Sequence, residues 1–209
     1  MNVSDVAVDK LSRSEVSGAS RLLARAFADD PIITHYLYGS LRRRLAFPAF
    51  FAAVLEEMLP SGHVYTARSG ETLVGVAAWT PPDAVEPDAS ARAAAARQQR
   101  LVRLLFPRAS RTLYQGFAAL EAFHPTGPPL VSGVRGHRAC IAGSGYWSDA
   151  PAASAGAGRR SETPCYLEMP FPCTHAFYER PGFERYAEHC PFIGAPQGAG
   201  SFLRKPDQP

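Results

Sequence analysis

The chain has 209 residues, of which 46% are hydrophobic, and a formal net charge of +3. This length fits one domain with a sizeable core, and we expect a single domain over residues 1–209. The basic residues are spread along the chain apart from Arg42–Arg44. We expect that run to be a solvated helix turn, and we expect no binding of nucleic acid.

The first ten residues contain no apolar signal region, and no apolar run approaches the roughly 20 residues of a membrane span. The four cysteines, Cys140, Cys165, Cys173 and Cys190, lack the spacing of metal ligands. We therefore expect a cytoplasmic protein with reduced thiols, no bound metal and no association with a membrane. The sequence leaves the oligomeric state open.

The first predicted element is a helix that begins at a capping box. In Ser12-Arg-Ser-Glu15, the hydroxyl can cap the third helical N–H while the carboxylate reaches back. Apolar residues then recur at helical spacing as far as Phe27, and Asp29-Asp30-Pro31 ends the helix. A second, strongly apolar helix is predicted over Leu41–Leu59, although it contains Pro48.

Strands are predicted next at Val64–Ala67 and Thr72–Thr80, joined by the turn signal Arg68-Ser-Gly70. An Ala/Arg-rich helix should follow from about Ser90 and break at Phe106-Pro107. Another helix should run from about Ser110 to Phe123.

Near the C-terminus the pattern predicts, in order, a strand, a short helix and two more strands: Cys165–Met169, His175–Glu179, Phe183–Cys190 and a strand near Phe202. Helices, a hairpin, helices and further strands indicate an α/β (α+β) layered domain.

The stretches LSRSEVSGASRLLARAFADDPIITHYL, GETLVGVAAWTPP and FYERPGFERY follow one another in this order along the chain. They resemble, respectively, the first helix with the loop after it, the following strand pair, and the late helix and strand of one branch of the GNAT-superfamily N-acetyltransferases. LEAFHPTGP matches the segment that leads, in that branch, into a strand beginning HWYL. The resemblance covers about Leu11–Pro128 and Thr163–Pro206.

The resemblance implies a mixed, splayed sheet flanked by helices, with acetyl-CoA lying in the splay. In the family, the pyrophosphate binds a loop of form Q/R-x-x-G-x-G/A at a helix N-terminus, where backbone N–H groups and the helix dipole favour anions. The chain should supply this loop between Pro128 and Thr163. It offers only Gly143-Ser-Gly145, with no apolar strand before it.

The neighbouring reading frame of the same stretch permits the missing motifs. Shifted by one base, the codons of Pro129–Ser132 permit HWYL, and those of Ala142–Ser148 permit QGLGTG. The shifted triplet of Trp147 encodes glycine whatever base follows, because tryptophan has a single codon. We therefore predict that about Pro129–Glu162 is translated out of frame between two compensating insertions or deletions, either as a sequencing error or as a real lesion.

If this polypeptide is real, we expect 129–162 to be an aberrant and disordered segment. The central strand and the pyrophosphate helix would be disturbed, and the sheet would be split with unpaired edge groups. The alternative is a genuine Gly/Ala-rich insertion.

Acetyl transfer needs a base for the amine proton and an acid for the leaving thiolate. By the resemblance, Tyr178 is the acid that protonates the sulfur, and Glu168 is placed to face the acceptor amine, directly or through water. Phe177 and Arg180 could line the path of the CoA tail. Each has a plainer alternative as a packed or solvent-facing side chain, and His124 with Glu121 could cap or turn the chain instead of taking part.

The resemblance therefore implies transfer of an acetyl group from acetyl-CoA to an amine of a small molecule or a protein, without an acyl-enzyme. The alternative is a catalytically inactive remnant or binding protein that has lost acetyl-CoA binding. A Cys/His hydrolase that uses His175 or His189 has no pairing motif to support it.

Overall fold

The structure is a computed structural model, and it describes residues 6–80, 86–120, 131–137, 165–169, 184–188, 194 and 200–204. The helices are α1 (Val16–Ala26), α2 (Pro31–Tyr36), α3 (Ser40–Met58), α4 (Ala89–Leu105) and α5 (Ala109–Leu120). The strands are β1 (Val6–Lys10), β2 (Val64–Ser69), β3 (Thr72–Thr80), β4 (Val131–His137), β5 (Cys165–Met169), β6 (Glu184–Glu188) and β7 (Gly200–Arg204).

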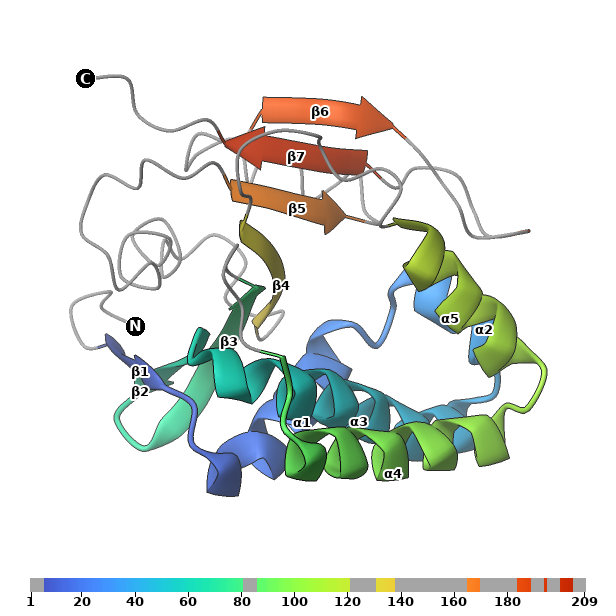
Figure 1. Ribbon diagram of the computed structural model, residues 1–209, viewed down its shortest axis with the longest axis horizontal. Coiled ribbons are helices and arrows are strands. Elements are labelled where there is room, and N and C mark those ends of the chain that lie inside the picture. The colour runs from blue at the N-terminus through green and yellow to red at the C-terminus, as the bar shows by residue number, and fades with distance from the viewer. Residues whose placement is uncertain are drawn as a thin grey trace.

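The strands form one sheet in the order β1-β2-β3-β4-β5-β7-β6. Every neighbouring pair is antiparallel except β4 and β5, which are parallel. In Figure 1, helices α1, α3 and α4 lie together beside β1–β3 and below β4, and β5, β7 and β6 form the far part of the sheet. The mixed, helix-flanked sheet that the sequence predicts is confirmed.

Strand β4 lies inside the segment 129–162 for which we expected disorder. Its backbone pairs with β3 from Thr80↔Ser132 to Gly75↔His137. The described sheet therefore continues through β4. The disturbance that we expected in the central strand and the pyrophosphate helix stays a prediction. Antiparallel pairing depends mainly on an available strand edge and on a chain that can adopt an extended backbone, and less on an apolar pattern. Strand β3 offers such an edge. The other residues of 129–162 lie outside the described residues.

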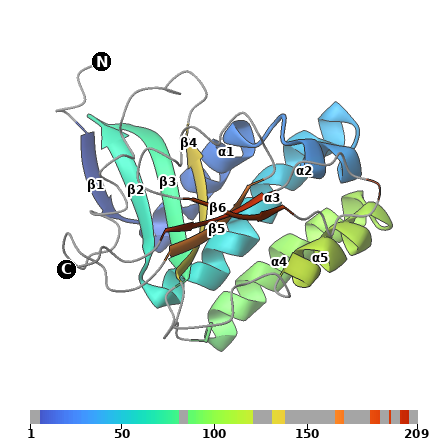
Figure 2. The same cartoon turned by 90° about the horizontal axis from the view of Figure 1, so that it is seen from above.

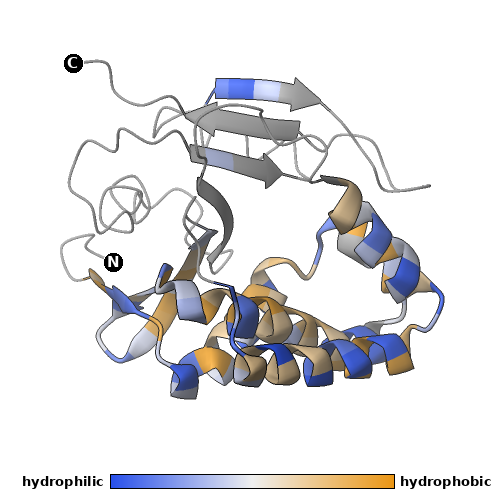
Figure 3. Ribbon diagram, viewed as in Figure 1, coloured by the Kyte–Doolittle hydropathy of each residue, from blue (hydrophilic) through white to orange (hydrophobic). Residues whose placement is uncertain are grey.

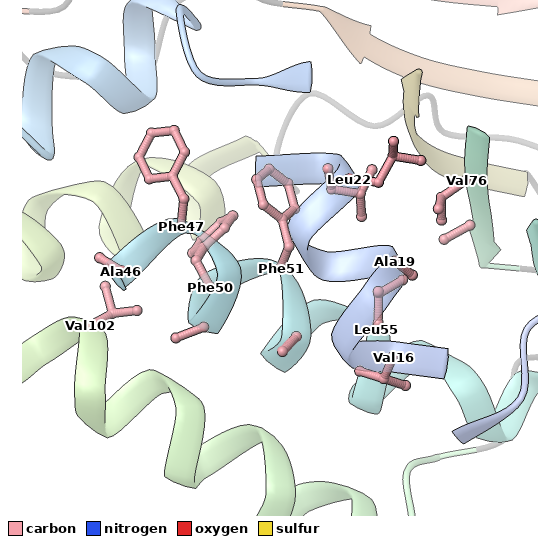
Figure 4. Close-up of a cluster of buried hydrophobic side chains, with 14 of the residues drawn as sticks. Val16, Ala19, Leu22, Ala46, Phe47, Phe50, Phe51, Leu55, Val76 and Val102 are labelled. Carbon is pink, nitrogen blue, oxygen red and sulfur yellow. The ribbon is translucent and has the colours of Figure 1, made fainter. Parts of the chain in front are cut away.

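The core lies between the helical layer and the sheet. It is built from the buried faces of α1, α3, α4, α5 and β3 (Figure 4). Phe51 is at its centre, with ring centroids 5.2 Å from Phe27, 6.5 Å from Phe47 and 5.2 Å from Phe50. Helix α3 continues through Pro48. Because proline has no N–H, the carbonyl of Arg44 loses its helical hydrogen-bond donor. Arg44 is exposed, so water can donate to this carbonyl instead.

Besides β4, two further elements were not predicted. Strand β1 is short and pairs with β2 from Val6↔Ser69 to Lys10↔Tyr65. Helix α2 begins at Pro31, the residue that we took only as the end of α1, because proline is well suited to the first turn of a helix. In this first turn, Thr34 N–H and the Thr34 hydroxyl both donate hydrogen bonds to the carbonyl oxygen of Asp30, at 2.8 and 2.6 Å. No helix in the described part of the chain is long and apolar enough to cross a membrane.

The predicted capping box is confirmed at the start of the first helical segment, which opens as a 3-10 turn. The Ser12 N–H and hydroxyl both donate to Glu15 Oε2, at 3.0 and 2.6 Å. The Arg68 guanidinium on β2 pairs with the other oxygen. The Ser12 hydroxyl, the Ser12 N–H and Arg68 together lower the pKa of Glu15 to about 2. The carboxylate therefore joins the helix start to the hairpin.

We expect Glu15→Gln to lower the free energy of unfolding by about 1 kcal/mol at pH 7, the usual value of a helix cap. A carboxyl with a lowered pKa stabilises the fold above its unfolded pKa, near 4.3, and stops doing so as the pH falls through its folded pKa. The difference between wild type and variant should therefore shrink from about pH 5 and vanish near pH 2. Urea unfolding across this range measures it, with Glu71→Gln in the exposed hairpin turn as the control. A difference that does not vary with pH would contradict the assignment.

Candidate functional site

The strands β4 and β5 start together and then separate. Their pairs are Val131↔Cys165, Ser132↔Tyr166 and Gly133↔Leu167. Beyond Gly133, β4 still pairs with β3 as far as His137, and β5 still pairs with β7 as far as Met169↔Gly200. Among the described strands, none pairs with the β5-facing edge of β4 after Gly133. In Figure 2, β5, β7 and β6 run across the direction of strands β1–β3.

This separation opens a stretch of backbone edge in the middle of the sheet. Unpaired N–H and C=O groups at a strand edge are a template for an extended ligand that has amide groups of its own. Among the described strands, residues 134–137 of β4 have no strand partner on the side that faces β5, which is the arrangement that main-chain recognition requires. Main-chain recognition does not depend on which side chains β4 contains, so it survives the unusual sequence of Val131–His137.

The parallel start of β5 is firmly held. Tyr166 is fully buried, and its ring centroid lies 6.3 Å from that of Tyr186 on β6. The backbone of Glu168 pairs with Ser201 of β7, which places this predicted residue on β5 beyond the last β4 pair. Tyr178, Phe177 and Arg180 lie outside the described residues, as do Glu121 and His124.

Helix α2 meets the turn between β6 and β7. A Cβ added at Gly194 would lie 3.5 Å from His35 Nε2, and Gly194 has a φ of +73° that favours glycine. The exposed His35 ring packs edge-on against Tyr36, with centroids 5.0 Å apart. Chain segments about 160 residues apart in sequence thus come together at this contact. The sequence analysis named neither His35 nor Gly194, and no local pattern marks their contact.

A second polar group of side chains lies among the helices. The guanidinium carbon of Arg103 lies over the Tyr114 ring of α5, 5.6 Å from the ring centroid. Gln99 Nε2 donates to Glu57 Oε1 at 3.1 Å. Burial raises the pKa of Tyr114, with Arg103 lowering it and Glu57 raising it further. Tyr114 is thus held neutral, and it packs against Phe50 at 6.2 Å. These contacts join α3, α4 and α5 rather than form a reaction centre.

No cluster of three or more His, Cys, Asp or Glu side chains that could hold a metal ion occurs in the described ranges. Cys140, Cys173 and Cys190 lie outside those ranges.

No protein-family model and no curated protein matches the chain. Solved structures do match it over nearly its whole length. A histone acetyltransferase HPA2-related acetyltransferase from Corynebacterium glutamicum superposes with a TM-score of 0.69, at 19% identity and 98% coverage of both chains. A putative arylalkylamine N-acetyltransferase from Aedes aegypti gives 0.59, at 12% identity, covering 95% of this chain and 86% of its own.

A polyamine N-acetyltransferase from Drosophila melanogaster gives a TM-score of 0.56 at 12% identity, covering 96% of this chain and 100% of its own. At such identities the likeness concerns the fold. It agrees with the parallel β4–β5 pair that separates within an otherwise antiparallel sheet. The chain has the fold of the GNAT-superfamily N-acetyltransferases.

Proposed function

We propose that this chain is an N-acetyltransferase by ancestry, which moves an acetyl group from acetyl-CoA to an amine of a small molecule or a protein. The observation that most supports this proposal is the separation of β4 from β5 after Gly133↔Leu167, in a fold shared with amine acetyltransferases. The open edge of β4 suits the extended, amide-containing arm of CoA. An acetyl thioester supplies the activated acyl group.

In this proposal the acceptor nitrogen forms its bond to the acetyl carbon directly, and the carbon–sulfur bond breaks. Glu168 takes the proton that the amine must lose, directly or through water. Tyr178 gives a proton to the departing sulfur, which would otherwise leave as a thiolate. Phe177 and Arg180 would line the path of the CoA tail. Each of these roles rests on the resemblance of YLEMPFPCTHAFYERPGF to the family.

The contact between α2 and the β6–β7 turn supports an acceptor site on that side of the sheet. Residues after Asp30 and the turn at Gly194 come from opposite ends of the chain and meet at His35. The neighbouring folds include enzymes named for polyamine and arylalkylamine acceptors, so these two classes of amine are the first to assay.

The alternative is a catalytically inactive remnant or binding protein. The observation that favours it is the printed sequence of 138–164, which lacks a Q/R-x-x-G-x-G/A loop to hold a pyrophosphate. Without convergent N–H groups at a helix N-terminus, much of the affinity for CoA would be lost.

We expect Tyr178→Phe to lower kcat for thiol release about 100-fold, since general acids commonly contribute that much or more, while KM for the amine changes little. The assay follows free thiol with polyamine and arylalkylamine acceptors, in the chain whose reading frame is restored over 129–162. Tyr186→Phe, a half-exposed tyrosine of β6, is the matched control. Equal rates for the two variants would remove Tyr178 from the mechanism. An absence of thiol release with every amine would argue against the proposed function itself.

A further inference from the structure

Helices α3 and α4 pack side by side in opposite directions. Gln99 of α4 donates to Glu57 at the end of α3, and Arg13 contacts both Ser90 at the start of α4, at 3.3 Å, and Glu56, at 3.8 Å. At the other end of the pair, Ala46 and Val102 are buried in the same core cluster and point toward one another (Figure 4). The start of α3 therefore lies beside the end of α4.

This packing decides which exposed residues share a surface. Two antiparallel helices are related by a local twofold axis perpendicular to their common plane, so residues at the same offset from the facing pair lie on the same side. Leu45 and Leu101 each precede the facing residues by one position. Leu41 and Arg97 each come one turn earlier on the same side, because an α-helix has 3.6 residues per turn.

The opposite side of the pair provides an internal check. Arg103 follows Val102 by one position, and its guanidinium lies over the Tyr114 ring of α5. Phe47, the equivalent residue of α3, is buried. That side therefore faces α5 and the core, and the side with Leu45 and Leu101 faces outward. Figure 3 shows apolar and hydrophilic residues side by side at the end of α4 that lies beneath α5.

We call this surface the Leu/Arg face; it consists of Leu41, Leu45, Leu101 and Leu104 with Arg42, Arg97 and Arg100. The four leucines are between 39% and 77% exposed. They are four of the six large hydrophobic side chains that are exposed in the described part of the chain, and all four come from this one end of α3 and α4. Leucines gathered in this way indicate a contact surface, whereas single exposed ones need no explanation.

The charge around these leucines has a single sign. Residues 31–55 and 89–120 contain nine arginines and no aspartate or glutamate, whereas the rest of the chain has 13 basic and 19 acidic residues. No described carboxylate forms an ion pair with Arg42, Arg97 or Arg100. The modest net charge of the whole chain therefore hides a strongly positive end.

In place of the expected solvated turn at Arg42–Arg44 and the expected absence of membrane association, we propose that the Leu/Arg face docks on an anionic membrane surface. Protruding leucines fit a deformable apolar medium, and the surrounding arginines can bind acidic lipid headgroups while their aliphatic stems remain in the interface. A nucleic acid would accept the arginines but offers no apolar layer for the leucines. A symmetric dimer through this face would set arginines against arginines, since the same patch meets itself. The docking is peripheral and independent of the acetyl-transfer proposal.

The full chain is mixed with vesicles of phosphatidylcholine alone and of phosphatidylcholine with phosphatidylglycerol, and the bound fraction is measured by flotation. We expect binding to the anionic vesicles only, weakened by added salt. Arg42→Glu with Arg100→Glu should reduce partitioning at least about 25-fold, since each interfacial arginine is worth about fivefold. Arg21→Glu with Arg25→Glu, which makes the same charge change on exposed positions of α1, should leave binding nearly intact.

Leu41→Ser with Leu101→Ser should reduce binding to the anionic vesicles about tenfold or more, with the melting transition unchanged. If the leucine variant binds as wild type does, attraction is only electrostatic and the proposed face is wrong. Equal loss in the α1 control overturns the proposal in the same way. Binding to an acidic protein or an oligonucleotide but not to vesicles, or a dimer that the leucine variant dissociates, would assign the face to another partner.

Discussion

Acetyl-CoA should raise the melting temperature of the chain whose reading frame is restored over Pro129–Glu162, and should leave that of the printed chain unchanged. A ligand that binds only the folded state stabilises it by mass action, by about 2.7 kcal/mol at 100 times its dissociation constant. For a chain of this size that corresponds to about 5–10 °C. The restored frame supplies QGLGTG, whose backbone N–H groups can converge on a pyrophosphate, and the printed frame supplies only Gly143-Ser-Gly145.

The outcomes of this experiment separate the hypotheses. A shift in both chains would show that the printed segment binds the cofactor by other means, and the out-of-frame interpretation would lose its functional meaning. A shift in neither would argue against acetyl-CoA as the ligand. Resequencing the coding DNA from the codon of His124 to that of Tyr166 tests the frame itself. Free ADP serves as the control, because it reports any binding of a pyrophosphate that is independent of the thioester arm.

Phe51→Ala should lower the free energy of unfolding by about 3–5 kcal/mol. Phe51 is 2% exposed and lies among Phe47 and Phe50 of α3 and Phe27, the residue that follows α1. Removing it leaves a cavity that these neighbouring rings cannot fill without leaving their rotamers. Because the net stability of a domain is about 5–15 kcal/mol, the variant loses a large part of it.

The measurement is urea unfolding at pH 7, with Leu45→Ala as the control on the same helix. Leu45 is 58% exposed, so its truncation should change the free energy of unfolding by less than about 0.5 kcal/mol. Similar losses in the two variants would mean that α3 is not packed as described.

The sequence by itself determined most of the local structure and the fold class. The capping box at Ser12, the helices α1 and α3, the β2–β3 hairpin and the strand Cys165–Met169 follow from short-range rules of capping, apolar periodicity and turn chemistry. The order of these elements, together with FYERPGF, was enough to predict the splayed GNAT fold. The predicted site residues Tyr178, Phe177 and Arg180 come from motif matching, and their geometry stays a prediction.

Only the tertiary structure decided three other features. Val131–His137 forms β4 because the edge of β3 offers backbone partners, a requirement that does not appear in the apolar pattern. His35 meets the turn at Gly194 although about 160 residues separate them. Along the chain, the arginines of α3 and α4 form no cluster beyond Arg42–Arg44. They share the Leu/Arg face because antiparallel packing sets the start of one helix beside the end of the other. Each depends on contacts between distant segments, which periodicity within a segment cannot encode.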